Sequence, residues 1–187
     1  DTSGAEFTSA SALTSFDSDG FTIGSDGGVN RDTQAYVAWS WKANGSGVSN
    51  TDGTTTGAVT VSANQESGFS IVKYVGQHST GGACTIGHGL NAVPSMIIAK
   101  QTSTGDNDWP VYHASEGAGK FCKLNGTPAF VSESTVWNNT EPTAEVFSVG
   151  SGNLANNNGK DYIAYVFSEV DGFSKFGSYT GNGSTDG

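Results

Sequence analysis

Two acidic loops contain the residue types that bind calcium. Asp17 and Asp19 belong to the stretch DSDG, and Asp106 and Asp108 belong to the stretch TGDND. Calcium takes carboxylate and carbonyl oxygens from such loops, although a helix-flanked calcium loop also needs a closing glutamate, which neither stretch has. Asp and Gly are equally common in turns that bind no metal. The sequence therefore allows calcium as a cofactor at these four residues, and it indicates no other cofactor.

Aromatic residues beside Asn and Asp suggest a second chemistry, the stacking of sugar rings. Trp109 follows Asp108, and Trp137 precedes Asn138 and Asn139, in segments that read as loops. An aromatic face packs against the apolar side of a sugar, while amides and carboxylates bind its hydroxyl groups. These five residues are therefore the candidate carbohydrate-binding residues.

The sequence offers no recognisable catalytic group. Its three histidines, His78, His88 and His113, lack the spacing of a helical metal site. Neither a Gly-x-Ser-x-Gly nucleophile turn nor a nucleotide-binding loop occurs. Glutamates such as Glu133 and Glu169 are not paired by any spacing that glycoside hydrolysis would need. We therefore expect a protein that is not an enzyme, with no catalytic residues.

Charge and composition exclude several partners. The 187 residues carry a formal net charge of −10, with Lys and Arg together numbering 8. Binding to nucleic acid or to an anionic membrane surface needs a basic face, which so few cations do not supply. No apolar run approaches the length of a membrane-spanning helix. We expect neither a nucleic-acid partner nor insertion into a membrane.

The chain repeats itself out of phase, and this is the most informative pattern in it. The stretch FTIGS at 21–25 precedes YVAWSW at 36–41 by the same spacing as FSVGS at 147–151 precedes YIAYVF at 162–167. The positions of Trp39 and Trp41 are therefore aromatic in both copies of the repeat, although the residue type differs. This predicts that both tryptophans pack in a core.

A second repeated pair lies beyond the first. GFS at 68–70 leads to Tyr74, and GFS at 172–174 leads to Tyr179. The offset of this pair is shorter, which places an insertion at 43–64, rich in Gly, Ser and Thr and read as a flexible linker or a long hairpin. The expected domains are 1–64, an N-terminal arm with the closing strands of one repeat and this linker; 65–171, a central β-sandwich repeat; and 172–187, the opening strand of a following repeat.

Alternation of apolar and polar residues predicts about ten short strands separated by turn signals. No helix longer than a single turn is expected. The pattern predicts an all-β fold, an antiparallel β-sandwich of the jelly-roll or lectin-like kind that contains the out-of-phase internal repeat. The expected strands are 21–24, 34–42, 69–76, 83–86, 95–100, 109–113, 119–124, 129–132, 146–149, 162–169 and 173–179.

Two cysteines, Cys84 and Cys122, lie in alternating segments of the chain. Such spacing allows one disulfide. Two buried free thiols fit the apolar surroundings better, because unpaired cysteine behaves as a small apolar residue.

Several stretches resemble a known family in order and spacing. SFDSDGFTIG, GFSIVKYVG, GHGLNAVPSMIIAK, WPVYHAS and FGSYTGNG resemble a repeat domain of large virion proteins from marine and cyanobacterial phages. Those proteins are usually labelled tail fibre or structural protein, and the domain itself has no known function. The resemblance covers nearly all of residues 10 to 187. It implies an all-β module on a virus particle and carries over no catalytic residue.

The expected function is that of a non-enzymatic virion module, in a tail fibre or a surface decoration, which presents a host-attachment surface. Two alternatives stay open, a carbohydrate-binding lectin-like module and an extracellular adhesin or filament subunit. The expected location is the virion surface or another extracellular site. The expected partners are a host surface glycan or protein and other virion proteins.

Incomplete repeats at both ends of the sandwich create exposed strand edges, and such edges pair readily with other strands. The closing strands at 20–42 and the opening strand at 172–187 can fold back onto the central repeat or pair with another subunit. We expect partial self-completion together with a homo-oligomer formed by strand sharing.

Overall fold

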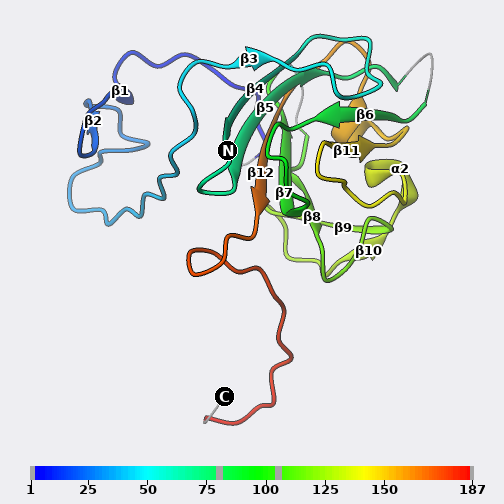
Figure 1. The fold of residues 1–187 in the computed structure, drawn as a ribbon. Coiled ribbons are helices and arrows are strands. Elements are labelled where there is room, and N and C mark those ends of the chain that lie inside the picture. Colours follow the sequence, from blue (N-terminus) through cyan, green and yellow to red (C-terminus); the bar gives the residue numbers. More distant parts are fainter. Residues whose placement is uncertain (1–2, 79–81, 104–106, 186–187) are drawn as a thin grey trace. The chain divides into compact units, whose positions relative to one another are not determined.

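The computed structural model describes residues 3–78, 82–103 and 107–185, and they are nearly all β-strand, turn and loop (Figure 1). Within these ranges the helices are single turns, α2 (Ser134–Trp137) and α3 (Asn153–Asn156). The chain divides into two compact units, one formed by Glu6–Trp41 and the other by Asp1–Ala5 with Lys42–Gly187.

An antiparallel sheet of eight strands dominates the larger unit. Its order is β10-β9-β8-β7-β12-β5-β4-β3, so β12 lies between β7 and β5 near the centre (Figure 1). The strands are β3 (Val48–Ser49), β4 (Val59–Asn64), β5 (Phe69–Val75), β7 (Pro94–Gln101), β8 (Pro110–His113), β9 (Lys120–Lys123), β10 (Val131–Ser132) and β12 (Asp161–Ser168).

Alternation along β12 builds the core. Tyr162, Ala164 and Val166 are buried in one apolar cluster, while Ile163 and Tyr165 between them point to the other face and are half-buried. Successive side chains of a strand alternate between the two faces of a sheet, so this spacing gives one fully covered face.

A second layer covers that face. It consists of the two-stranded sheet of β6 (Cys84–Gly87) and β11 (Val146–Val149), together with α2 and α3. Ile86, Phe147 and Val149 from this layer join the same core as the large sheet. The predicted all-β, sandwich-like fold is therefore confirmed.

The smaller unit holds a separate hairpin of β1 (Leu13–Phe16) and β2 (Phe21–Ile23). The turn between them closes with a hydrogen bond of 2.9 Å from the Asp17 amide to the Gly20 carbonyl. The expectation of a plain N-terminal arm is wrong at β1, because Leu13–Phe16 pairs with the apolar strand β2.

Two predicted strands, 34–42 and 173–179, do not form. In the part of the chain that the structure describes, neither segment pairs with another strand, apart from an isolated bridge between Val170 and Ser174. Trp39 and Trp41, expected in a core, are exposed. Alternating residues form a strand only where a neighbouring strand pairs with their backbone groups, and within the described residues neither segment has such a strand beside it.

The stretch 43–64 contains a long hairpin, one of the two expected alternatives, rather than a flexible linker. β3 and β4 lie within it, and β4 pairs with β5 along its whole length. The larger unit therefore includes the chain from Lys42 onward, whereas the predicted central domain started at residue 65. Cys84 and Cys122 are both free cysteines.

Removing apolar volume from the centre of the large sheet should destabilise the sandwich. Ile97 of β7 is fully buried in the core, and Leu124 is 58 % exposed. We expect Ile97→Ala to lower the free energy of unfolding by about 2–5 kcal/mol and Leu124→Ala to change it little. Urea denaturation checks this, and equal losses for the two variants would contradict this placement of the core.

Candidate functional site

Asp108 and Trp109 lie together before β8 and are already engaged. Asp108 Oδ2 lies 2.7 Å from Lys123 Nζ, and Asp108 Oδ1 accepts a hydrogen bond of 3.0 Å from Asn125 Nδ2. These contacts with Lys123 and Asn125 lower the pKa of the Asp108 carboxyl. Trp109 is half-buried, and Lys100 Nζ lies 5.8 Å from its ring centroid. The pair is thus part of a polar network rather than an open sugar platform.

Trp137 does not lie in an exposed loop, and this expectation is wrong. It is the last residue of α2 and only 1 % exposed, with its ring edge-on to Tyr112 at 6.3 Å. Its apolar area is buried in the second layer, so the ring has no free face for a sugar. Asn138 and Asn139 are exposed and take φ values of 58° and 48°, which end the helix. Trp109 and Trp137 therefore form no shared aromatic patch.

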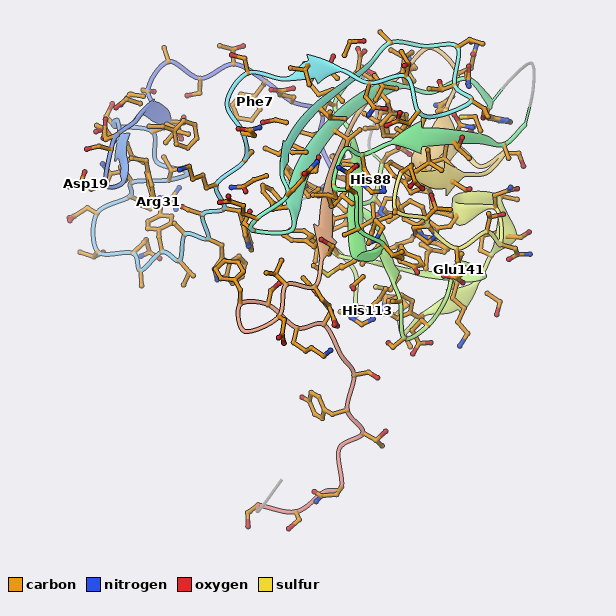
Figure 2. The ribbon with its side chains drawn as sticks, viewed as in Figure 1. Phe7, Asp19, Arg31, His88, His113 and Glu141 are labelled. Atoms are coloured by element: carbon orange, nitrogen blue, oxygen red, sulfur yellow. The ribbon has the colours of Figure 1, made fainter. Side chains whose placement is uncertain are left out.

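Of the expected calcium residues, Asp17 and Asp19 belong to the smaller unit and Asp108 belongs to the larger one. Both Asp17 carboxylate oxygens accept hydrogen bonds, from Ser15 Oγ and Thr22 Oγ1, within the β1–β2 hairpin. Asp19 is exposed at the tip of that hairpin (Figure 2). Asp106 lies outside the described residues. Within the described ranges, no group of three or more His, Cys, Asp or Glu side chains gathers where it could hold a metal ion.

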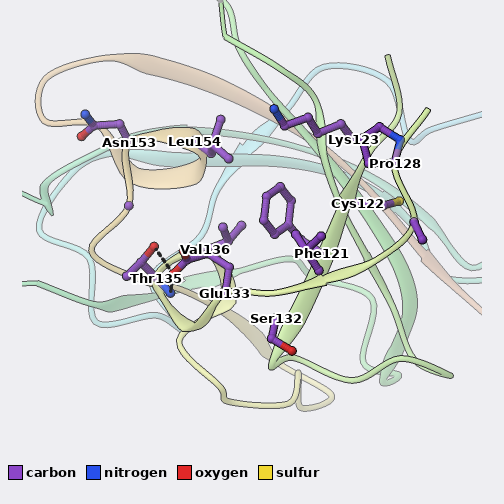
Figure 3. A pocket seen from close by; sticks show the side chains of 13 residues that line it. Phe121, Cys122, Lys123, Pro128, Ser132, Glu133, Thr135, Val136, Asn153 and Leu154 are labelled. Atoms are coloured by element: carbon purple, nitrogen blue, oxygen red, sulfur yellow. Dashed lines mark hydrogen bonds between the residues drawn. The ribbon is translucent and has the colours of Figure 1, made fainter. Parts of the chain in front are cut away.

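A cavity of about 470 Å³ opens between β9, β10 and the starts of α2 and α3 (Figure 3). Phe121, Val136 and Leu154 give it apolar walls. Glu133, which also lines it, accepts hydrogen bonds from the Thr135 amide and hydroxyl and so caps α2. The cavity was not predicted, because its walls come from segments far apart in the sequence.

The thiol of Cys122, another residue of this cavity, is half-buried, and burial raises its pKa. Thiol chemistry requires the thiolate form. The thiol is therefore held protonated at neutral pH, and the cavity has no activated nucleophile at this position.

Two polar contacts hold the loop after α2. His88 is fully buried, its Nε2 lies 3.2 Å from the Thr143 carbonyl, and its Nδ1 accepts from the Leu90 amide. The partners assign the proton to Nε2. The Tyr112 hydroxyl donates to Glu141 Oε2 at 2.7 Å. Figure 2 labels His88 and Glu141 in the larger unit. Both ring nitrogens of His88 contact backbone groups, so His88 has a structural role.

Residues 133–162, which we call the closing motif, end in a compact polar turn. The Tyr162 hydroxyl donates to the Asn153 carbonyl at 2.6 Å and accepts from the Asn157 amide at 3.0 Å. Asn156 Nδ2 donates to the Gly150 carbonyl at 2.7 Å. The turn therefore folds around the Tyr162 hydroxyl and the Asn156 amide.

The end of β5 completes this turn. Tyr74 stacks on Tyr162 with ring centroids 5.1 Å apart, and its hydroxyl donates to the Ala155 carbonyl at 2.8 Å. The Gly76 amide donates to the Lys160 carbonyl at 2.9 Å. These contacts satisfy backbone carbonyls that the buried turn leaves without partners of their own.

Two more bonds join the same strand end to the turn, and a third joins the turn to the segment before β6. The Gln77 amide donates to Asn156 Oδ1 at 2.8 Å, and the Gly159 amide donates to the Gly76 carbonyl, also at 2.8 Å. Asn156 Nδ2 donates a second hydrogen bond, to the Gly82 carbonyl at 3.1 Å. The closing motif is thus built to bind one strand end.

Residues 9–36, which we call the N-terminal motif, reproduce the hydrogen bonds inside the polar turn of the closing motif. The Tyr36 hydroxyl donates to the Gly27 carbonyl and accepts from the Arg31 amide, as Tyr162 does with Asn153 and Asn157. Asn30 Nδ2 donates to the Gly24 carbonyl at 2.8 Å, as Asn156 does to Gly150. The sequence repeat is therefore also a structural repeat.

Backbone conformation repeats as well. A Cβ on Gly150 would overlap the Thr135 carbonyl oxygen, and a Cβ on Gly24 would overlap the Ser11 carbonyl oxygen. Thr33 takes a φ of 64° where the closing motif has Gly159. A β-branched residue rarely adopts this region, so the surrounding hydrogen bonds hold it there.

The two motifs differ in how far their aromatic side chains are exposed. Tyr162 and Phe147 are each 1 % exposed, whereas Tyr36 is 50 % exposed and Phe21 is 41 % exposed. The N-terminal motif therefore presents an apolar face whose counterpart is the core of the sandwich. We take this face as the candidate functional site, and the repeat spacing is the sequence signal that pointed to it.

Substituting Gly150 should be far more costly than substituting Gly177, which has no neighbouring atoms within 4 Å of an added Cβ. Gly150→Ala forces the Thr135 backbone to move, so we expect a loss of about 1–3 kcal/mol in the free energy of unfolding. Gly177→Ala should leave it nearly unchanged. Urea titrations compare them, and a neutral Gly150→Ala would refute the close approach.

Acid should destabilise the sandwich through His88, because burial lowers the pKa of its imidazole below the ordinary 6.5. The unfolded state then binds the proton more tightly, so stability is complete above pH 6.5 and falls as the pH drops below it. We expect His88→Gln to flatten this part of the stability profile and His113→Gln to leave it intact. Denaturation at several pH values between 5 and 7.5 tests the difference, and an unchanged slope in His88→Gln would argue against it.

None of the helices in the described ranges has the length and apolar character that crossing a bilayer requires. A comparison with curated proteins gave no match, and neither did a comparison with solved structures. A family model matches residues 1–187, and its description is a domain of unknown function, DUF7483. The chain therefore belongs to the DUF7483 family.

Proposed function

We propose that the chain is a non-enzymatic structural module of a phage virion, part of a tail fibre or a surface decoration, which presents a host-attachment surface. The observation that carries this proposal is the twofold occurrence of one motif, buried in the sandwich at 133–162 and exposed at 9–36. A module that exposes a second copy of a motif from its own core is suited to stacking with further modules. Stacked repeats of this kind form extended surfaces.

The virion setting rests on the resemblance of the sequence to repeat domains of phage tail-fibre and structural proteins. The chemistry of the chain suits that setting. Its net charge of −10 keeps an exposed protein soluble. Loops with exposed amides, such as those of Asn138 and Asn139, offer weak polar contacts. Many copies on one particle bind the host together, so these weak contacts give a high avidity. The proposed partners are other virion proteins and a glycan or protein of the host surface.

A structural role also accounts for the side chains that most resemble catalytic groups. His88 has both ring nitrogens bonded to backbone groups, and burial keeps the Cys122 thiol protonated. Of the two tryptophans expected to bind sugars in the lectin-like alternative, Trp109 is half-buried and Trp137 is buried. The same stacking argument supports an extracellular adhesin or filament subunit. The source of the chain distinguishes this role from the virion role.

The proposal predicts that the chain is a component of purified virus particles. Particles of the phage that encodes it should contain its peptides by mass spectrometry, and antibodies against it should label the tail or shell in electron micrographs. The same antibodies should slow adsorption to the host, with antibodies against an internal virion protein as the control. Absence from intact particles would refute the virion role, and labelling without slower adsorption would refute the attachment role.

A further inference from the structure

The C-terminal tail, residues 172–185, repeats the sequence of β5. Gly172 and Phe173 correspond to Gly68 and Phe69, and the two glycines share a positive φ of 72° and 65°. Tyr179 corresponds to Tyr74, whose hydroxyl binds the closing motif. Phe173 is 71 % exposed and Tyr179 is 95 % exposed. The tail therefore carries the residues of a strand that binds a closing motif, and it displays them to solvent.

The N-terminal motif carries the matching acceptors. By the repeat, the Val29 carbonyl corresponds to that of Ala155, which accepts from Tyr74, and the Gln34 carbonyl corresponds to that of Lys160, which accepts from Gly76. Asn30 Oδ1 corresponds to the atom that accepts from Gln77. These groups stand on a turn whose internal hydrogen bonds already match, so the site is preformed.

We propose that the N-terminal motif of one copy binds the C-terminal tail of a second copy of this chain. The Tyr179 hydroxyl donates to the Val29 carbonyl, the Gly181 amide to the Gln34 carbonyl, and the Asn182 amide to Asn30 Oδ1. The Tyr179 ring stacks on Tyr36, as Tyr74 stacks on Tyr162 within the sandwich. This inference rests on the proposed function, because it names the contact by which the modules assemble.

The register follows from the pairing of β5 with β12. Phe69 lies opposite Phe167, with ring centroids 5.0 Å apart, so Phe173 lies opposite Trp41. Lys73 lies opposite Ile163, which places Ser178 opposite Val37. The tail has one more residue between its Phe and its Tyr than β5 has. A bulge at Gly177, where an added Cβ would meet no atom within 4 Å, absorbs this residue.

The occupant is a second copy because the tail of this chain carries the strand sequence that the N-terminal motif lacks. Tyr36 is 50 % exposed and Tyr179 is 95 % exposed, and the closing motif of the sandwich already holds its own β5. Pairing each tail with the next motif is a head-to-tail contact, so the copies form a chain or a ring rather than a twofold dimer.

A disulfide between copies tests this register. Val37→Cys in one tagged full-length chain and Ser178→Cys in a chain with a different tag, both with Cys122→Ser, should form a disulfide between the two tags under mild oxidation. Ala38→Cys replaces Val37→Cys in the control, because neighbouring strand residues point to opposite faces. No disulfide, or an equal yield with the control, would overturn the pairing. A bond that forms only within one chain carrying both cysteines would overturn the second copy as the occupant.

Assembly measured by light scattering gives an independent test. We expect Tyr179→Ala to weaken association about tenfold or more, as truncating an aromatic anchor does at other interfaces. The control is Leu124→Ala, which removes an exposed apolar side chain elsewhere, and circular dichroism should show both variants folded. Equal association of the two variants would overturn the inference. These results do not depend on finding the chain in virus particles, so a failure here and a failure of the virion role are distinguishable.

Discussion

The structure of the sandwich depends on how the backbone carbonyls of its closing turn obtain hydrogen-bond donors. Residues 150–160 cross the end of the core, where unpaired backbone carbonyls would carry a desolvation penalty. The stacked pair of Tyr74 and Tyr162 meets this constraint, because each ring is buried while each hydroxyl donates to a carbonyl of α3. The two strands that supply the tyrosines, β5 and β12, are neighbours at the centre of the sheet. One pair of side chains thus couples the second layer to the sheet.

The same constraint explains why the N-terminal motif differs from its counterpart. It retains the internal hydrogen bonds of the turn, through Tyr36 and Asn30, which need no second strand. The segment that follows Tyr36 forms no strand, whereas its counterpart β12 is paired on both sides. Local sequence therefore fixes the turn, and a strand forms only where its neighbours are present. In the assembly that we propose, this exposed half-core binds the missing strand.

The sequence was most informative where periodicity was strong. Alternation predicted β5, β7 and β12 and the all-β fold, and the repeat predicted that two segments share one local structure. It failed at 34–42 and 173–179, where alternation predicted strands but no neighbouring strand pairs with either segment in the described part of the chain. It also misplaced Trp137, because the single turn α2 buries a residue whose Asn neighbours suggest a loop. The cavity between β9, β10, α2 and α3 stayed hidden, because only tertiary packing brings its walls together.

Hydrogen exchange of two equivalent amides, those of Asn157 and Arg31, tests most directly whether a second copy completes the N-terminal motif. Both donate to a tyrosine hydroxyl in the same local geometry, and only one is covered by a strand. If a second copy completes the N-terminal motif, the Asn157 amide exchanges slowly at every protein concentration, and exchange of the Arg31 amide slows as the concentration rises. Exchange of the Arg31 amide that is independent of concentration would contradict a motif completed by a second copy.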